Sequence, residues 1–239
     1  MNPLTADEKR EASLFLHALK EEGIEELLVS LAAPKTQAPP TMILSAPASS
    51  SMVKDAMVEL RDQALKCTKC QELSRGRTTV VFGSGNLKAK LMFVGEAPGR
   101  DEDEQGLPFV GAAGQLLTKI IESIGIERRQ VFIANVLKCR PPQNRTPEPD
   151  EIENCSPYLW KQIELIQPQI ICALGTFAAQ TLLKTQTSIS QLRGKFYNFQ
   201  NSKLICTYHP AYLLRNPGEK AKVWDDMKKI KKELETLPS

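Results

Sequence analysis

The chain has 239 residues, of which 41% are hydrophobic and 25% are charged, so it can bury a sizeable core. Lys and Arg number 31 against 28 Asp and Glu, a small excess that by itself decides nothing about nucleic acid, although a local basic patch could still steer a polyanion. No apolar run approaches the roughly 18 residues of a membrane span, and no apolar core follows the mixed-charge start. We therefore expect a soluble, cytoplasmic protein without a membrane segment.

Residues 1–52 are expected to form an appended arm. Residues 5–31 begin with a capping box and carry leucines at loosely helical spacing, which predicts a helix. Residues 32–51 hold four prolines and four serines without a periodic apolar face, as is typical of a flexible linker. The sequence thus predicts an arm over residues 1–52 and one domain over residues 53–239.

Helical and strand-like segments alternate from residue 53 onward. Short apolar runs predict strands at 90–95, 131–136, 169–175 and 203–208. Helices are predicted at 54–66, 111–124, 150–166, 175–184 and 219–236. Strands separated by helices indicate a parallel sheet, which binds ligands at the carboxyl ends of its strands. Gly95 with Glu96, Asn135 and His209 all lie at or just after such ends, so we expect them to meet at one edge.

Four of the six cysteines have the spacing of metal ligands. Cys67 and Cys70 form a Cys-x-x-Cys pair in a basic segment, and Cys139 and Cys155 flank a proline-rich one. Two pairs of thiolates suit one tetrahedral centre. Zinc and a cubane iron–sulfur cluster both take four Cys ligands, and the spacing does not separate them. The other two cysteines lie inside apolar strands and are expected to pack as core residues.

The segment at residues 95–111, GEAPGRDEDEQGLPFVG, is poorly explained as a solvated acidic loop. Glycines and prolines flank its acidic residues, and Phe109 stands where the loop returns to a helix. Glycine-rich turns at a strand end let the backbone approach a ligand closely. Asn135 is polar inside an apolar strand, where an unpaired amide costs about 1–3 kcal/mol. We therefore expect Asn135 to have a hydrogen-bond partner, either in the protein or in a ligand.

The run at residues 208–217, YHPAYLLRNP, contains one of the two histidines in the chain. His209 follows a predicted strand and precedes a proline-bounded loop that carries two leucines and an arginine. Exposed leucines beside a cation are typical of a wedge that enters a base stack next to a phosphate contact. We expect Leu213 to be this wedge and Arg215 to be the phosphate contact.

These three motifs and the cysteine spacing closely resemble the family 4 uracil-DNA glycosylases, the iron–sulfur branch of that superfamily. The match covers about residues 57–235, and the N-terminal arm lies outside it. The resemblance implies an α/β fold, a three-layer α/β/α sandwich around a four-stranded parallel sheet. It also implies a [4Fe-4S] cluster on the four paired cysteines and an enzyme of base excision repair. Such an enzyme flips uracil out of DNA and hydrolyses its N-glycosidic bond, leaving an abasic site.

The resemblance further implies how the base is bound. Phe109 would stack on the uracil ring. The Asn135 amide would bind the N3–H and O4 edge and so reject cytosine, whose donor pattern is reversed. His209 would donate to O2, where negative charge appears only in the transition state. A neutral imidazole suffices for that role.

Two carboxylates are expected to act beside the base. The family 1 pattern has an aspartate where this chain has Ala97, so Glu96 is the predicted water-positioning residue. Glu102 is the second carboxylate, predicted to fill the space beside uracil C5, and the two roles could be exchanged. Gly95 and Ala97 are expected to complete the wall of the substrate site.

The alternative is a non-catalytic, metal-stabilised DNA-binding or interaction protein of the same fold, with zinc on its cysteines. For the glycosylase we expect a monomer that binds uracil-containing DNA, and the arm could bind a replication or repair protein. A related branch traps DNA covalently through a histidine in an extra basic loop. Residues 139–154 contain no histidine, so hydrolysis with turnover is expected.

Overall fold

The computed structural model describes residues 50–237, so the predicted N-terminal helix and linker lie outside the described residues. Within this range the chain forms one sheet in the strand order β1-β3-β2-β4-β6-β5. The strands are β1 (Ser84–Gly85), β2 (Leu91–Gly95), β3 (Phe132–Asn135), β4 (Ile170–Leu174), β5 (Phe196–Phe199) and β6 (Ser202–Thr207). The four strands predicted from apolar runs are β2, β3, β4 and β6, each within about two residues of its expected bounds.

The sheet is mixed. Strands β3, β2, β4 and β6 pair in parallel, whereas β1 and β5 pair antiparallel at the two edges. The expected four-stranded parallel sheet is thus extended at both edges by an antiparallel strand, which makes the sheet six-stranded and mixed. Both edge strands lack the buried apolar run that predicts a strand: β1 has two residues, and no residue of β5 is fully buried. β5 returns to β6 through a tight turn in which Gln200 has a φ of 50°.

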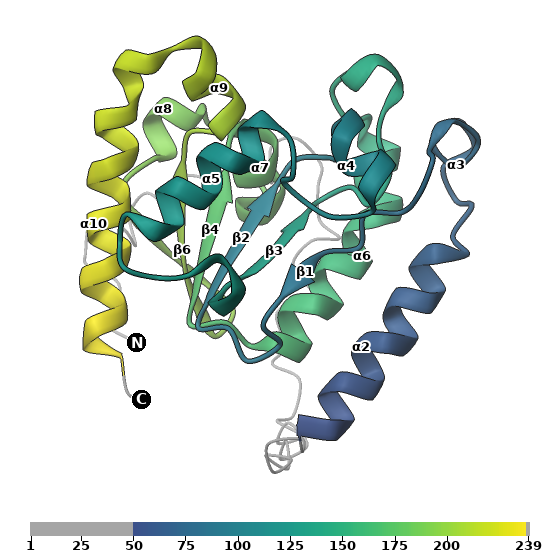
Figure 1. Ribbon diagram of the computed structural model, residues 1–239, viewed down its shortest axis with the longest axis horizontal. Coiled ribbons are helices and arrows are strands. Elements are labelled where there is room, and N and C mark those ends of the chain that lie inside the picture. Colours follow the sequence, from purple (N-terminus) through teal and green to yellow (C-terminus); the bar gives the residue numbers. More distant parts are fainter. Residues whose placement is uncertain (1–49, 238–239) are drawn as a thin grey trace, which may run out of the picture. The chain divides into compact units, whose positions relative to one another are not determined.

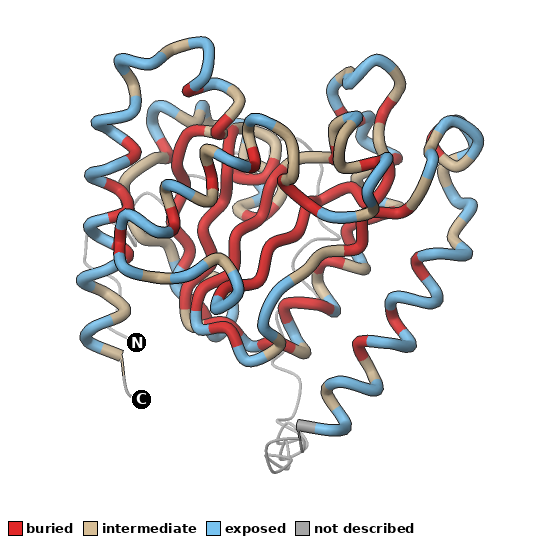
Figure 2. The backbone as a smooth tube through the Cα atoms, in the orientation of Figure 1, coloured by how far each residue is buried: buried red, intermediate tan, exposed pale blue. Residues whose placement is uncertain are grey.

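Helices cover both faces of the sheet and give three layers (Figure 1). One face packs against α2 (Ser50–Leu65), α3 (Gln71–Gly76), α6 (Pro149–Ile166) and α7 (Thr176–Leu183). The other packs against α5 (Ala112–Glu122), α9 (Pro210–Arg215) and α10 (Lys220–Thr236). Because side chains alternate along a strand, Met92 and Val94 join the first layer while Leu91 and Phe93 join the second. The central strands are buried on both faces (Figure 2).

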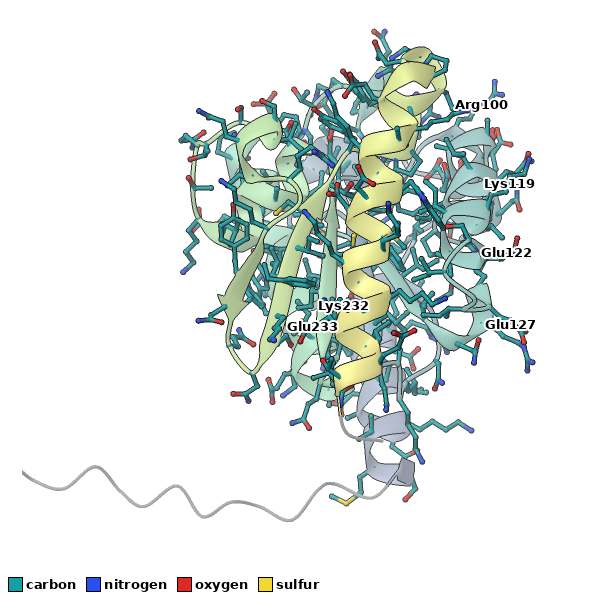
Figure 3. All side chains as sticks on the ribbon, turned by 90° about the vertical axis from the view of Figure 1, so that its left-hand side faces the viewer. Arg100, Lys119, Glu122, Glu127, Lys232 and Glu233 are labelled. Atoms are coloured by element: carbon teal, nitrogen blue, oxygen red, sulfur yellow. The ribbon has the colours of Figure 1, made fainter. Side chains whose placement is uncertain are left out.

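Helix α10 fixes the end of β6. Val223, Met227 and Ile230 form its buried stripe, and Lys232 is exposed (Figure 3). Glu233 accepts a hydrogen bond from Lys203 of β6. The one fully buried carboxylate of α10, Asp226, accepts hydrogen bonds from Thr207 Oγ1 at 2.6 Å and Arg193 Nη2 at 2.7 Å. These bonds hold β6 just before His209. No helix among residues 50–237 is long and apolar enough to cross a membrane.

Candidate active site

A cavity of about 710 Å³ lies at the carboxyl ends of the parallel strands. Its wall is built from segments that follow β2, β3, β4 and β6, as expected for a ligand site of an open parallel sheet. Most of the residues predicted for the site line this cavity: Glu96, Ala97, Glu102, Phe109, Asn135, His209 and Arg215. Three distant motifs of the sequence therefore meet in one place.

Phe109 is held in an unusual backbone conformation beside two glycines. It is 7% exposed, and its φ of 54° is uncommon for an aromatic residue. A Cβ on Gly95 would come within 2.6 Å of the Phe109 ring, and one on Gly114 within 1.9 Å of its carbonyl oxygen. Gly95 therefore acts by letting the ring approach β2, and it does not itself line the cavity.

Glu102 braces the loop that carries Phe109. It lies in the short helix α4 (Arg100–Gln105) and lines the cavity. Its Oε1 accepts hydrogen bonds from the backbone N–H groups of Val110 at 2.8 Å and Gly111 at 2.9 Å, and Oε2 accepts from Gly99 at 3.1 Å. Both carboxylate oxygens are thus already bonded to the backbone, which leaves Glu96 as the better candidate for binding water.

The Asn135 amide lies at the end of β3 with an unused acceptor. The residue is 2% exposed, and its Oδ1 has no hydrogen-bond partner among the described residues. A buried acceptor without a donor costs about 1–3 kcal/mol. The partner expected from the sequence is therefore not supplied by this part of the protein, and an N–H group of a ligand in the cavity would supply it.

The His209 imidazole is held as a neutral donor. Its Nδ1 accepts a hydrogen bond from the backbone N–H of Ala211 at 3.1 Å, so the ring proton is on Nε2. Burial and the neighbouring Arg215 guanidinium lower the pKa of His209 to about 4. The ring centroids of His209 and Phe109 are 5.5 Å apart. The two rings therefore share one wall, and the imidazole stays uncharged at neutral pH.

Glu96 is a carboxylate of the cavity lining whose pKa is raised. It follows β2 directly, and its backbone carbonyl accepts a hydrogen bond from Leu137 N at 3.0 Å. Burial raises the pKa of Glu96 to about 7. A carboxylate with this pKa can exchange a proton with water near neutral pH, as a general base requires.

The leucine predicted as a wedge is buried. Leu213 is 1% exposed and belongs to the core between α9 and α5, so its assignment as a wedge is wrong. Leu214, the next residue, is 46% exposed. Arg215 is exposed, lines the cavity and forms no ion pair within residues 50–237, so its charge is available to a phosphate.

The four cysteines predicted as metal ligands come together beside α6. The thiols of Cys70 and Cys139 each interact electrostatically with Cys67, and that of Cys155 interacts with Cys139 and Cys70. Two of the sulfurs accept hydrogen bonds. Arg77 Nη1 lies 3.1 Å from Cys139 Sγ, and the backbone N of Lys138 lies 3.1 Å from Cys155 Sγ. In the described part of the chain, no three His, Cys, Asp or Glu side chains converge closely enough to hold a single metal ion.

One wall of the cavity was not predicted from the sequence. Gly175, Thr176 and Phe177 follow β4 and line it, and their signal is a Gly-Thr pair at the end of the strand predicted at 169–175. Arg128 was not predicted either; it donates from Nη2 to the carbonyl of Pro108 at 2.7 Å and so supports the Phe109 loop. Nothing in the local sequence distinguishes Arg128 from a surface arginine.

Comparison with known proteins identifies the family of this chain. Residues 82–228 match the model of the uracil DNA glycosylase superfamily, which defines the class of protein. The chain is 46% identical to the type-4 uracil-DNA glycosylase of Archaeoglobus fulgidus, over 74% of this chain and 92% of the relative. It is 47% identical to that of Sulfurisphaera tokodaii, over 77% and 87%, and 44% identical to that of Thermotoga maritima, over 74% and 94%. The chain belongs to the type-4 uracil-DNA glycosylases.

Proposed function

We propose that this chain is a DNA repair enzyme that binds a flipped-out uracil in the cavity and hydrolyses its N-glycosidic bond. The observation that carries the site assignment is the buried, unpaired Oδ1 of Asn135 beside the Phe109 ring and a neutral imidazole. A uracil inside the duplex stack is out of reach, so the nucleotide must leave the stack at a cost of a few kcal/mol. Arg215, an exposed residue of the cavity lining, would contact a DNA phosphate.

The cavity can recognise uracil by its hydrogen-bonding edge. Asn135 Oδ1 accepts from N3–H of uracil, and the amide N–H of the same side chain donates to O4. Cytosine presents an acceptor at N3 and a donor at N4, so both contacts would be lost. A site built around buried polar groups rejects such a base strongly, because its own groups would stay unpaired.

In this proposal His209 stabilises the negative charge that develops on the leaving base. As the C1′–N1 bond lengthens, the bonding electrons move onto the base and negative charge builds on O2. The Nε2–H of a neutral imidazole can donate to that oxygen, and this bond strengthens in the transition state. The sugar becomes cationic at the same time, and Glu96 can orient the water that attacks C1′.

The role of Glu96 predicts a pH dependence. Its pKa is raised to about 7, and water orientation needs the ionised form, so activity should rise with pH through about 7. Between pH 8 and pH 6 the single-turnover rate should fall about tenfold, because roughly nine-tenths of the carboxylate is protonated at one unit below its pKa.

The pH profile is measured with wild type, Glu96→Gln and Glu104→Gln. Glu104 is an exposed acid of α4, and its variant should keep the wild-type profile. Glu96→Gln should be slower and nearly independent of pH over this range. An equally steep profile in Glu96→Gln would assign the titration to another group.

We propose that Cys67, Cys70, Cys139 and Cys155 hold one [4Fe-4S] cluster. Their thiols interact with one another, and donors point at two of the sulfurs, an arrangement that suits thiolates bonded to iron. Sulfurs around one zinc ion lie within about 4 Å of each other, since Zn–S bonds are about 2.3 Å. A cubane of four irons holds its ligands further apart. The cluster would tie the segment before α3 to α6 and support the fold.

Metal analysis tests this assignment. Protein purified without oxygen should contain about four irons per chain, and Cys155→Ser should lose iron and unfold more easily because metal binding is coupled to folding. Cys172→Ala, a cysteine of β4 outside the group, should keep the iron. Stoichiometric zinc without iron would contradict the assignment.

The activity itself is tested with a uracil-containing oligonucleotide. The full chain should produce alkali-labile sites at uracil and release free uracil. The same oligonucleotide with thymine at that position should stay intact. Absence of uracil release by folded, metal-loaded protein would favour the non-catalytic alternative.

A further inference from the structure

Lys138 is a buried cation without an acidic partner. It is 1% exposed, and no carboxylate forms an ion pair with it within residues 50–237. Its Nζ lies 5.9 Å from the centre of the Phe82 ring. Burying an ammonium group is costly unless every donor is well used. The groups that Lys138 bonds therefore indicate what the residue is for.

The Lys138 ammonium group donates a hydrogen bond to the backbone of Asn135, the residue proposed to recognise uracil. Lys138 Nζ donates to the carbonyl oxygen of Asn135 at 2.9 Å and to Gln162 Oε1 at 2.7 Å. Gln162 Nε2 in turn donates to the carbonyl of Phe82 at 2.9 Å. The backbone of Lys138 is also held, because its carbonyl accepts from Val81 N at 2.8 Å.

The Asn135 carbonyl needs this donor because the sheet does not supply one. Strand β1 pairs only with Phe132 and Ile133, so it ends before it reaches Asn135. On the opposite side, Val136 N and Leu137 N bond the carbonyls of the β2 segment at 3.0 Å each. Lys138 therefore supplies the missing strand contact at the residue whose amide must match the uracil edge.

We propose that Lys138 is a positioning residue that fixes the Asn135 amide in the plane of the bound base. The proposal rests on the proposed uracil site. Lys138 does not line the cavity, and of the two residues that its ammonium group bonds, Asn135 lines the cavity and Gln162 does not. Small displacements of a recognition group can cost about a hundredfold in rate. Loss of the Lys138 bond should thus slow uracil release without removing any group that touches the base.

The test is a double-mutant cycle between Lys138→Met and Asn135→Ala, measured by single-turnover uracil release. Lys138→Met keeps the length and bulk of the side chain but loses its donors. It should slow the otherwise wild-type enzyme by about ten- to a hundredfold and slow the Asn135→Ala enzyme by less than about threefold. Equal slowing in both backgrounds, or no slowing in either, would overturn the proposal.

Gln162→Met is the matched control. It breaks the same buried network but leaves the bond from Lys138 to Asn135 in place, so it should lower the thermal unfolding temperature while keeping the rate within about threefold of wild type. If Gln162→Met loses as much rate as Lys138→Met, the whole network has only a structural role and the proposal is wrong. If Lys138→Met does not fold, Lys138→Leu gives the same cycle, because it also removes every donor of the side chain.

Wild-type protein assayed in parallel separates the two claims. If wild type releases no uracil, the proposed function fails, and the role of Lys138 in positioning the uracil-binding amide fails with it. If wild type is active and the cycle shows no coupling, only the role of Lys138 fails. The iron content of each variant, measured on the same samples, shows whether loss of the neighbouring cysteine centre accounts for the effect.

Discussion

His209→Ala should lower the single-turnover rate of uracil release by about 10²–10³-fold, the range seen when one donor to a developing oxyanion is removed. The structure holds the imidazole neutral, with Nδ1 bonded to Ala211 N and a pKa lowered to about 4. Its Nε2–H is therefore a donor throughout the pH range of the assay. The loss should be similar at pH 6 and pH 8, and binding of uracil-containing DNA should change much less than the rate.

The matched control for His209→Ala is His17→Ala, since His17 is the only other histidine of the chain. The His17→Ala variant should release uracil at the wild-type rate. Near-normal uracil release by a folded His209→Ala variant would show that the imidazole has a structural role, such as capping α9, and that the donor to O2 lies elsewhere.

Asn135→Asp should change which base is released. The carboxylate can accept a hydrogen bond from the exocyclic amine of cytosine, but it offers no donor to O4 of uracil. Uracil release should fall by about one to two orders of magnitude, as expected from a loss of roughly 1–3 kcal/mol at one buried contact. A slow release of cytosine should appear at the same time. Both bases are measured from the same duplex by mass spectrometry.

Asn198→Asp provides the control for this change in charge. Asn198 is an exposed residue of edge strand β5, outside the lining of the cavity, and its variant should release uracil at the wild-type rate without attacking cytosine. Unchanged uracil release by Asn135→Asp would mean that this amide does not contact the base.

The parts of the fold that follow from local patterns could be predicted from the sequence. The strands β2, β3, β4 and β6 each contain a buried apolar run, and helices cover both faces of the sheet that they form. The edge strands β1 and β5 could not be predicted in this way, since they are short or half-exposed and are defined by their pairing with β3 and β6. Parallel order then explains why Asn135 and His209, which are 74 positions apart, line one cavity.

The errors arise where tertiary contacts decide the role of a side chain. Leu213 and Leu214 are equivalent as sequence, but successive residues of a helix point about 100° apart. In α9, Leu213 faces the core and Leu214 faces solvent, as their exposures of 1% and 46% show. The burial of Lys138 also depends on tertiary contacts. A lysine in Val-Leu-Lys-Cys is typical of a surface residue, and its buried partner Gln162 is 24 positions away in the sequence.

The structure of the His209→Ala variant bound to a uracil-containing duplex tests the central claim most directly. We expect the uracil outside the stack, inside the cavity and against the Phe109 ring. Its N3 should lie about 2.7–3.2 Å from Asn135 Oδ1, as in an ordinary hydrogen bond. A uracil that is bound at another surface of the protein, or that occupies the cavity with its N3–H and O4 edge turned away from Asn135, would contradict the account.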